Sequence, residues 1–180
     1  MQYFISKRNI PNTLFILLIL SHQKHNTMIE LSEGQKAPNF SAKDQNGELI
    51  SLSNFEGKNI ILYFYPKDDT PGCTAEACSF RDHYESLIAQ GFVVLGVSTD
   101  DEKSHLKFIN KHNLPFSLIA DTEKEIVEAY GVWVEKNMYG KKYMGIARKT
   151  FIIDKKGLIL KIIDKVDTKN SSAQVLDLLK

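Results

Sequence analysis

The chain has 180 residues, of which 43% are hydrophobic and 25% are charged, as in a globular domain with a core of its own. Its formal net charge of +1 gives no indication of a nucleic-acid partner or of binding to a membrane surface. Two cysteines are too few for the disulfide scaffold of a small secreted protein. In a reducing compartment, a close cysteine pair is more often redox-active or metal-binding than structural.

The N-terminal segment differs from the rest of the chain. Two basic residues precede an unbroken apolar run from Leu14 to Leu20, which is far too short to span a bilayer as a helix. The run is similar to the core of a signal peptide, but the polar, bulky residues after it provide no small-residue cleavage site. We expect residues 1–27 to be an extension from an upstream start codon, and residues 28–180 to form one domain. This assignment favours a cytoplasmic protein, and export or organelle targeting is the alternative.

Strands and helices are predicted in alternation after Met28. Residues 37–55 alternate polar and apolar around Gln45-Asn46-Gly47, which predicts a β-hairpin. The apolar run over residues 59–66 predicts a central strand buried on both faces, and a helix is expected over residues 71–90. Further strands are expected over residues 92–100 and 116–121 and on both sides of a turn at 154–157. Further helices are expected over residues 101–112, 122–131 and 171–180. Ser98-Thr99-Asp100 is expected to cap the helix over residues 101–112.

Alternating strands and helices give parallel strands, and the late hairpin adds antiparallel ones. The predicted fold class is therefore α/β, with one mixed sheet between helices. In such folds, chemistry tends to lie where the carboxyl end of a strand leads into a helix. Both cysteines lie in the segment that directly follows the strand over residues 59–66.

Cys73 is the first candidate functional residue. Thr70 is placed to act as the N-cap of the expected helix, and Pro71 follows at a position where a missing N–H costs nothing. Cys73 then lies in the first turn, where the backbone N–H groups are unpaired and the helix dipole is positive. Both features stabilise a thiolate, so Cys73 is a candidate nucleophile. The alternative is a small apolar residue packed in that turn.

Cys78 lies five positions after Cys73 on the same expected helix. In an intact helix, this spacing separates the two Cα atoms by roughly 8–9 Å. A disulfide needs Cα atoms within about 7 Å of each other. The two cysteines can therefore bond only after one or two helical turns unwind, which excludes a static bridge and suits a transient one.

Zinc binding and a thioredoxin-type dithiol are two other uses of a close cysteine pair. A structural zinc ion needs four ligands, and only His83 lies near the pair, while His105 and His112 belong to another predicted helix. A thioredoxin-type dithiol has the pattern Cys-x-x-Cys, which this pair does not have.

The segment PKDDTPGC fits the pattern Pro-x-x-x-Thr-x-x-Cys and resembles the signature of the peroxiredoxins. The longer segment TPGCTAEACSFRD is similar to the bacterioferritin-comigratory-protein or Q-type branch of that family, in which a resolving cysteine follows the peroxidatic one by five residues. The resemblance extends from about Met28 to Lys180 and includes GQKAPNF, YGV with Trp133, and ARKTFIID.

The resemblance implies a thioredoxin-like fold and the reduction of hydrogen peroxide and organic hydroperoxides. It implies that Cys73 is the peroxidatic cysteine and that Cys78 is the resolving cysteine, so that the two form a disulfide during turnover. Thr70 would hydrogen-bond the thiolate and the bound peroxide, Pro66 would shield the pocket from water, and Arg148 would be the pocket arginine.

The resemblance also implies thioredoxin as the reductant, a monomer, and no metal or organic cofactor. The preferred hydroperoxide, and glutaredoxin in place of thioredoxin, stay open. Competing functions are a thiol-disulfide oxidoreductase that acts on protein disulfides and a zinc-binding or interaction module. Without the resemblance, Arg148 would be assigned to a solvated position at a strand start, and Glu76 is expected to be an ordinary first-turn acid favoured by the helix dipole.

Overall fold

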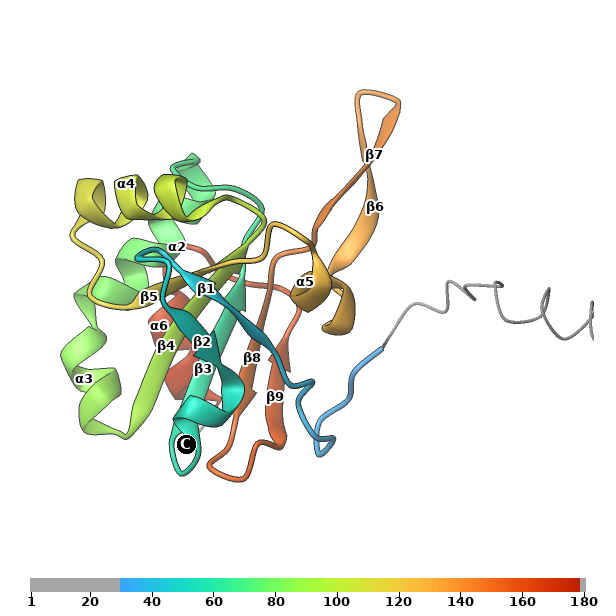
Figure 1. Ribbon diagram of the computed structural model, residues 1–180. Coiled ribbons are helices and arrows are strands. Elements are labelled where there is room, and N and C mark those ends of the chain that lie inside the picture. Colours follow the sequence, from blue (N-terminus) through green and yellow to red (C-terminus); the bar gives the residue numbers. More distant parts are fainter. Residues whose placement is uncertain (1–29, 179–180) are drawn as a thin grey trace, which may run out of the picture.

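The computed structural model describes residues 30–178, which form a seven-stranded mixed sheet with helices on both faces (Figure 1). The expected boundary between residues 27 and 28 lies outside the described residues. The strands are β1 (Ser41–Asp44), β2 (Leu49–Ser51), β3 (Asn59–Phe64), β4 (Phe92–Ser98), β5 (Ser117–Ala120), β6 (Trp133–Met138), β7 (Lys141–Ile146), β8 (Lys149–Ile153) and β9 (Ile159–Ile163). The helices are η1 (Leu52–Phe55), α2 (Pro71–Asp82), α3 (Tyr84–Ala89), α4 (Glu102–His112), α5 (Glu125–Ala129) and α6 (Ser171–Asp177).

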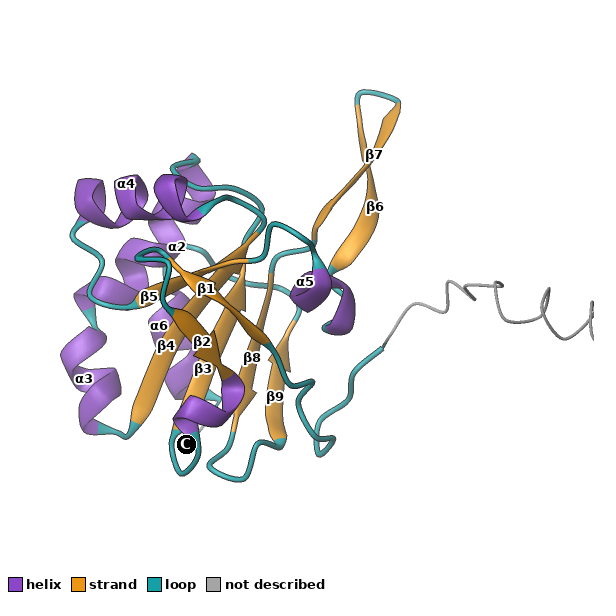
Figure 2. Ribbon diagram, viewed as in Figure 1, coloured by secondary structure: helices purple, strands orange, loops and turns teal. Residues whose placement is uncertain are grey.

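The strand order in the large sheet is β2-β1-β5-β4-β3-β8-β9. Strands β3, β4 and β5 are parallel to one another. Strand β8 pairs antiparallel with β3, and β9 pairs antiparallel with β8. The prediction of one mixed sheet between helices is therefore confirmed, and β3 lies in its interior as expected. The carboxyl ends of β3 and β4 lie side by side, and the segments that follow these two strands lead into α2 and α4 (Figure 2).

The central strand β3 is buried on both faces because its residues alternate between two hydrophobic clusters. Ile60, Leu62 and Phe64 pack in the cluster that includes residues of α5. Ile61 and Tyr63 pack in the cluster that includes residues of α2, α3 and α4. This two-residue period is that of a strand, and it explains why a continuous apolar run is required here.

The first hairpin, β1 and β2, forms with the predicted turn. Asp44 Oδ1 accepts hydrogen bonds from the backbone N–H groups of Asn46 (2.8 Å) and Glu48 (3.0 Å). Gly47 has a φ of +78°, which glycine adopts without the steric cost that a side chain would impose. The second predicted turn, at residues 154–157, joins β8 and β9.

Two details of the helices differ from the prediction. The helix expected over residues 71–90 is interrupted at His83, whose backbone leaves the helical region at φ −114°. The His83 ring bonds the Ser79 carbonyl oxygen (3.1 Å) and Ser172 Oγ (3.0 Å), so it takes up a carbonyl that a continuous helix would bond through its backbone. The cap of α4 is Asp101, not the residues before it, since its side chain accepts from the Ser104 N–H at 2.8 Å.

The hairpin of β6 and β7, which projects from the body of the domain (Figure 1), was not predicted from the sequence. Its turn is formed by Tyr139 and Gly140, both with positive φ. The base of the hairpin packs against the core through Trp133 and Ile146. Toward its tip, four large apolar side chains are exposed: Met138, Tyr139, Tyr143 and Met144. The strands were missed because they contain many polar residues and have no buried face to impose a clear alternation.

Candidate active site

Cys73 lies in the first turn of α2, which begins after the carboxyl end of β3. Thr70 has the extended backbone of an N-cap, Pro71 is the first helical residue, and the Thr70 carbonyl oxygen accepts the first helical hydrogen bond from the Thr74 N–H at 2.8 Å. The Cys73 side chain is buried, with 1% exposed. The structure therefore places this thiol where the sequence predicts it, at the positive end of a helix.

Arg148 is brought to Cys73 by the register of the sheet. Strand β8 begins at Lys149, which pairs with Phe64 at the end of β3, so the residue before β8 lies beside the start of α2. Arg148 Nη2 donates a hydrogen bond to Cys73 Sγ at 3.1 Å. Gly72 has no Cβ, and one built on its backbone would lie 3.4 Å from the same Nη2 atom. The guanidinium therefore lies directly against the first turn of α2. A cation in this position stabilises a sulfur anion.

Glu76 is a site residue that the sequence analysis did not identify. Its side chain is fully buried, and its Oε2 accepts a hydrogen bond from Arg148 Nη1. Arg148 therefore joins a carboxylate and a thiol from the same helix face through its two terminal nitrogens. The spacing of three residues between Cys73 and Glu76, which places them on one face of a helix, was the signal available in the sequence.

Burial raises the pKa of Glu76 from its ordinary value of 4.5 to about 7, although the charge and hydrogen bond of Arg148 oppose this. For Arg148, burial alone would lower the pKa, but Glu76 and Cys73 outweigh it, so the guanidinium is held in its charged form. The site therefore contains a permanent cation next to the sulfur and a carboxyl group that changes charge near neutral pH.

Lys136 is a second cation close to this site. It lies on β6, and its ammonium group donates a hydrogen bond to the Ile146 carbonyl oxygen at 2.5 Å. Burial and the positive charge of Arg148 lower its pKa, and Cys73 opposes this change. The projecting hairpin therefore contributes positive charge to the surroundings of Cys73.

Thr70 and Pro66 lie near the start of α2, and no side-chain hydrogen bond within residues 30–178 joins either of them to Cys73. The Thr70 hydroxyl donates to the Lys67 carbonyl oxygen at 3.1 Å and makes no capping bond to the helix, so a side-chain cap at this residue is not formed. Pro66 is exposed. Their expected roles toward a bound peroxide stay predictions.

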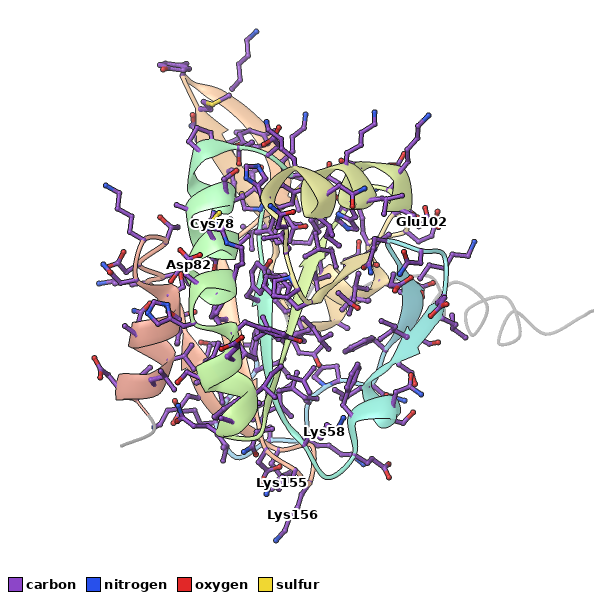
Figure 3. All side chains as sticks on the ribbon, turned by 90° about the vertical axis from the view of Figure 1, so that its left-hand side faces the viewer. Lys58, Cys78, Asp82, Glu102, Lys155 and Lys156 are labelled. Carbon is purple, nitrogen blue, oxygen red and sulfur yellow. The ribbon has the colours of Figure 1, made fainter. Side chains whose placement is uncertain are left out.

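Cys78 lies on the same helix as Cys73, close to Asp82 and half-buried (Figure 3). Both cysteines are free thiols, and α2 is continuous from Pro71 to Asp82. The intact helix thus keeps the two residues at the spacing that the sequence analysis found too long for a disulfide.

The described residues contain no group of three or more His, Cys, Asp or Glu side chains that could hold a metal ion. Of the histidines considered as zinc ligands, His105 is fully buried against Asp68 and His112 pairs with Asp69, so both are engaged away from the cysteines. Within residues 30–178, no helix has the length and apolar character that crossing a membrane requires.

Comparison with known proteins gives one consistent result. The AhpC/TSA family model matches residues 33–162. Peroxiredoxin Bcp of Bacillus subtilis is 52% identical over 147 residues, which cover 82% of this chain and 94% of that protein. A structure of PrxQ from Xylella fastidiosa superposes with a TM-score of 0.79 at 30% identity, covering 84% of this chain and 96% of that one.

A structure of the Xanthomonas campestris bacterioferritin comigratory protein, described with its alkyl peroxide reduction activity, has a TM-score of 0.74 at 35% identity. The match covers 78% of this chain and 89% of that one. The fold is therefore thioredoxin-like, as the resemblance implied. The chain belongs to the AhpC/TSA family, within which it is a peroxiredoxin of the Bcp or Q-type branch and thus a thiol peroxidase.

Proposed function

We propose that Cys73 is the peroxidatic cysteine of this peroxidase. The observation that carries the proposal is the contact between Arg148 Nη2 and Cys73 Sγ, 3.1 Å, at the N-terminus of α2. The Cys73 thiolate attacks one oxygen of the hydroperoxide, the O–O bond breaks, and the other oxygen leaves with the bonding electron pair as hydroxide or alkoxide. Cys73 becomes a sulfenic acid, and the leaving oxygen takes up a proton to give water or an alcohol.

Stabilisation of the leaving oxygen is the second task of the site. A more stable thiolate is also a weaker nucleophile, so stabilising the thiolate alone gives little rate gain. Negative charge moves from sulfur to the departing oxygen during the reaction, and donors that face this charge lower the barrier. Arg148 and the free N–H groups of Gly72 and Cys73 are placed for this role, and Glu76 orients Arg148 through its ion pair. Thr70 and Pro66 would complete the pocket.

Cys78 is proposed as the resolving cysteine. Its thiol attacks the Cys73 sulfenic acid, the S–O bond breaks, and a Cys73–Cys78 disulfide forms with release of water. This step requires α2 to unwind locally, as low-stability segments do. The later part of α2 is attached to α6, where Ser79 Oγ and Ser172 Oγ are 3.1 Å apart. Unwinding is therefore expected to begin in the first two turns, which contain both cysteines.

The disulfide is reduced by thioredoxin, the protein acts as a monomer, and its compartment is the cytoplasm. Support for thioredoxin is the membership of the Bcp or Q-type branch. The similarity to the Xanthomonas campestris protein extends the proposed substrates from hydrogen peroxide to alkyl hydroperoxides. The two free thiols are consistent with a reducing compartment.

The test is a peroxide assay coupled to thioredoxin with the wild type and two variants. Cys73→Ser is expected to abolish peroxide consumption. Cys78→Ser is expected to reduce one equivalent of peroxide and then stop, because the sulfenic acid has no partner. If Cys73→Ser consumed peroxide at the wild-type rate, or if Cys78→Ser turned over normally with thioredoxin, the assignment of the respective cysteine would be wrong.

A further inference from the structure

The turn over residues 67–70, called here the active-site turn, connects β3 to α2 and is attached to α4 by two consecutive carboxylates. Asp68 is buried and Asp69 is partly exposed, and each contacts side chains of α4. Peroxide reduction as described above uses neither residue. Their position, immediately before the N-cap of the helix that carries both cysteines, suggests a role in controlling that helix.

Asp68 accepts three hydrogen bonds in the buried contact. Its Oδ1 accepts from the Tyr65 hydroxyl at 2.7 Å, and its Oδ2 accepts from Ser104 Oγ at 2.7 Å and lies 2.9 Å from His105 Nδ1. Burial would raise the pKa of Asp68, but His105, Tyr65 and Ser104 outweigh burial and lower it, so the carboxylate is charged. The Asp68 N–H in turn donates to Asp100 Oδ2 at 2.9 Å.

His105 connects Asp68 to β5, because both of its ring nitrogens face acceptors. Nδ1 faces the Asp68 carboxylate, and Nε2 lies 3.2 Å from the Ile119 carbonyl oxygen, which can only accept. The ring is 0% exposed, and through it Asp68 ties the active-site turn to α4 and β5.

Asp69 makes the outer contact. Its Oδ2 lies 2.6 Å from Lys111 Nζ and its Oδ1 lies 2.9 Å from His112 Nε2, both in the last turn of α4. Its backbone is left-handed, with a φ of +55°, a conformation that persists when surrounding contacts hold it. Asp69 directly precedes Thr70, whose carbonyl accepts the first hydrogen bond of α2. Loss of that first turn would free Asp69 to relax and would break its ion pairs.

We propose that Asp68 and Asp69 form a clamp that holds the active-site turn on α4 and thereby limits how often the first turns of α2 unwind. The clamp keeps Cys73 beside Arg148 for the reaction with peroxide and slows the approach of Cys78. Asp68, Asp69 and their α4 partners are thus positioning residues. The consequence of the clamp for turnover rests on the proposed function of the two cysteines.

The exposed half of the clamp provides variants that leave the core intact. Asp69→Asn removes the charge, and asparagine also adopts a left-handed backbone readily. Lys111→Met removes one ion pair, and Lys111→Arg retains it. Glu33→Gln is the matched control, because the Glu33–Lys161 pair (2.9 Å) is also exposed and joins the N-terminal loop to β9, away from α4. In the buried half of the clamp, Tyr65→Phe removes one donor to Asp68 and keeps the aromatic ring.

Two measurements test the clamp. The first is amide hydrogen exchange over residues 74–78 in the reduced protein, and the second is the rate of disulfide formation after one equivalent of peroxide. Asp69→Asn is expected to raise the exchange rate and the rate of disulfide formation about threefold, because exposed ion pairs of this kind contribute little stability. Lys111→Met and Tyr65→Phe are expected to change both in the same direction, while Lys111→Arg and Glu33→Gln match the wild type. The share of Cys73 over-oxidised to sulfinic acid at high peroxide is expected to fall in the loosened variants.

The two readouts separate this proposal from the one on which it rests. If Asp69→Asn and Tyr65→Phe only lower the melting temperature, with exchange over residues 74–78 unchanged or slower, the clamp is wrong. If exchange accelerates as expected but the wild type never forms the Cys73–Cys78 disulfide, the clamp stands and the proposed role of Cys78 fails.

Discussion

Arg148→Lys tests the central contact of the site. Lysine keeps the positive charge, but one ammonium cannot reproduce the two donors that Arg148 directs to Cys73 and Glu76. At the 3.1 Å between Nη2 and Sγ, two unit charges interact by about 5 kcal/mol for an effective dielectric constant of 20. This interaction lowers the barrier only to the extent that Arg148 also stabilises the negative charge that develops on the leaving oxygen. Loss of one such donor typically costs about 2.7–4 kcal/mol, so we expect the rate with peroxide to fall at least about 100-fold.

The assay is rapid mixing of reduced protein with peroxide in a Cys78→Ser background, which isolates the first step. Glu76→Gln is expected to slow this step about tenfold on its own, through loss of a charge-assisted hydrogen bond that orients Arg148. In the Arg148→Lys background the same change is expected to cost less than about threefold, because the group that Glu76 orients has been replaced. Arg81→Lys is the control, because Arg81 lies on α2 with Cys73 and Glu76 but pairs with Asp82. A rate within threefold of the parent for Arg148→Lys, or full additivity of the two changes, would refute this reasoning.

Three further predictions concern stability. The folded state binds the Glu76 proton more tightly than the unfolded state. The stability of the wild type relative to Glu76→Gln is therefore greatest below pH 4.5 and falls by about 3 kcal/mol as pH rises through about 7. Urea unfolding of both proteins at pH 5 and pH 8 measures this, and the same difference in unfolding free energy at the two pH values would contradict it. A Cβ at Gly96 would lie 2.6 Å from Leu118 and 2.7 Å from Tyr63, so Gly96→Ala is expected to lower the free energy of unfolding by about 1–3 kcal/mol, and an unchanged denaturation midpoint would show that the core yields there. Asp101→Ala is expected to cost about 1 kcal/mol through loss of the cap of α4, a value to be compared with Lys107→Ala, which changes an exposed residue of the same helix and removes no cap.

Local sequence patterns predicted most of the sheet. The apolar run of β3, the hairpin turns and the helical periods depend on residues that are neighbours in the chain, so their preferences can be read without knowledge of the fold. The predictions failed where tertiary contacts override these preferences. The interruption at His83 depends on Ser172 of a distant helix, and the β6–β7 hairpin has no buried face to mark it.

The sequence by itself determined that Cys73 lies in the first turn of a helix that follows a central strand. It also determined that Cys78 lies too far along this helix to form a disulfide with Cys73 while the helix is intact. Only the tertiary structure decided which groups surround the sulfur. Arg148 is 75 residues from Cys73 and reaches it because β8 pairs antiparallel with β3, and the same contact turns Glu76 from an ordinary helical acid into a buried partner of the arginine. Helix position is set by short-range backbone bonding, whereas the meeting of these three side chains depends on strand order and register, which no local pattern records.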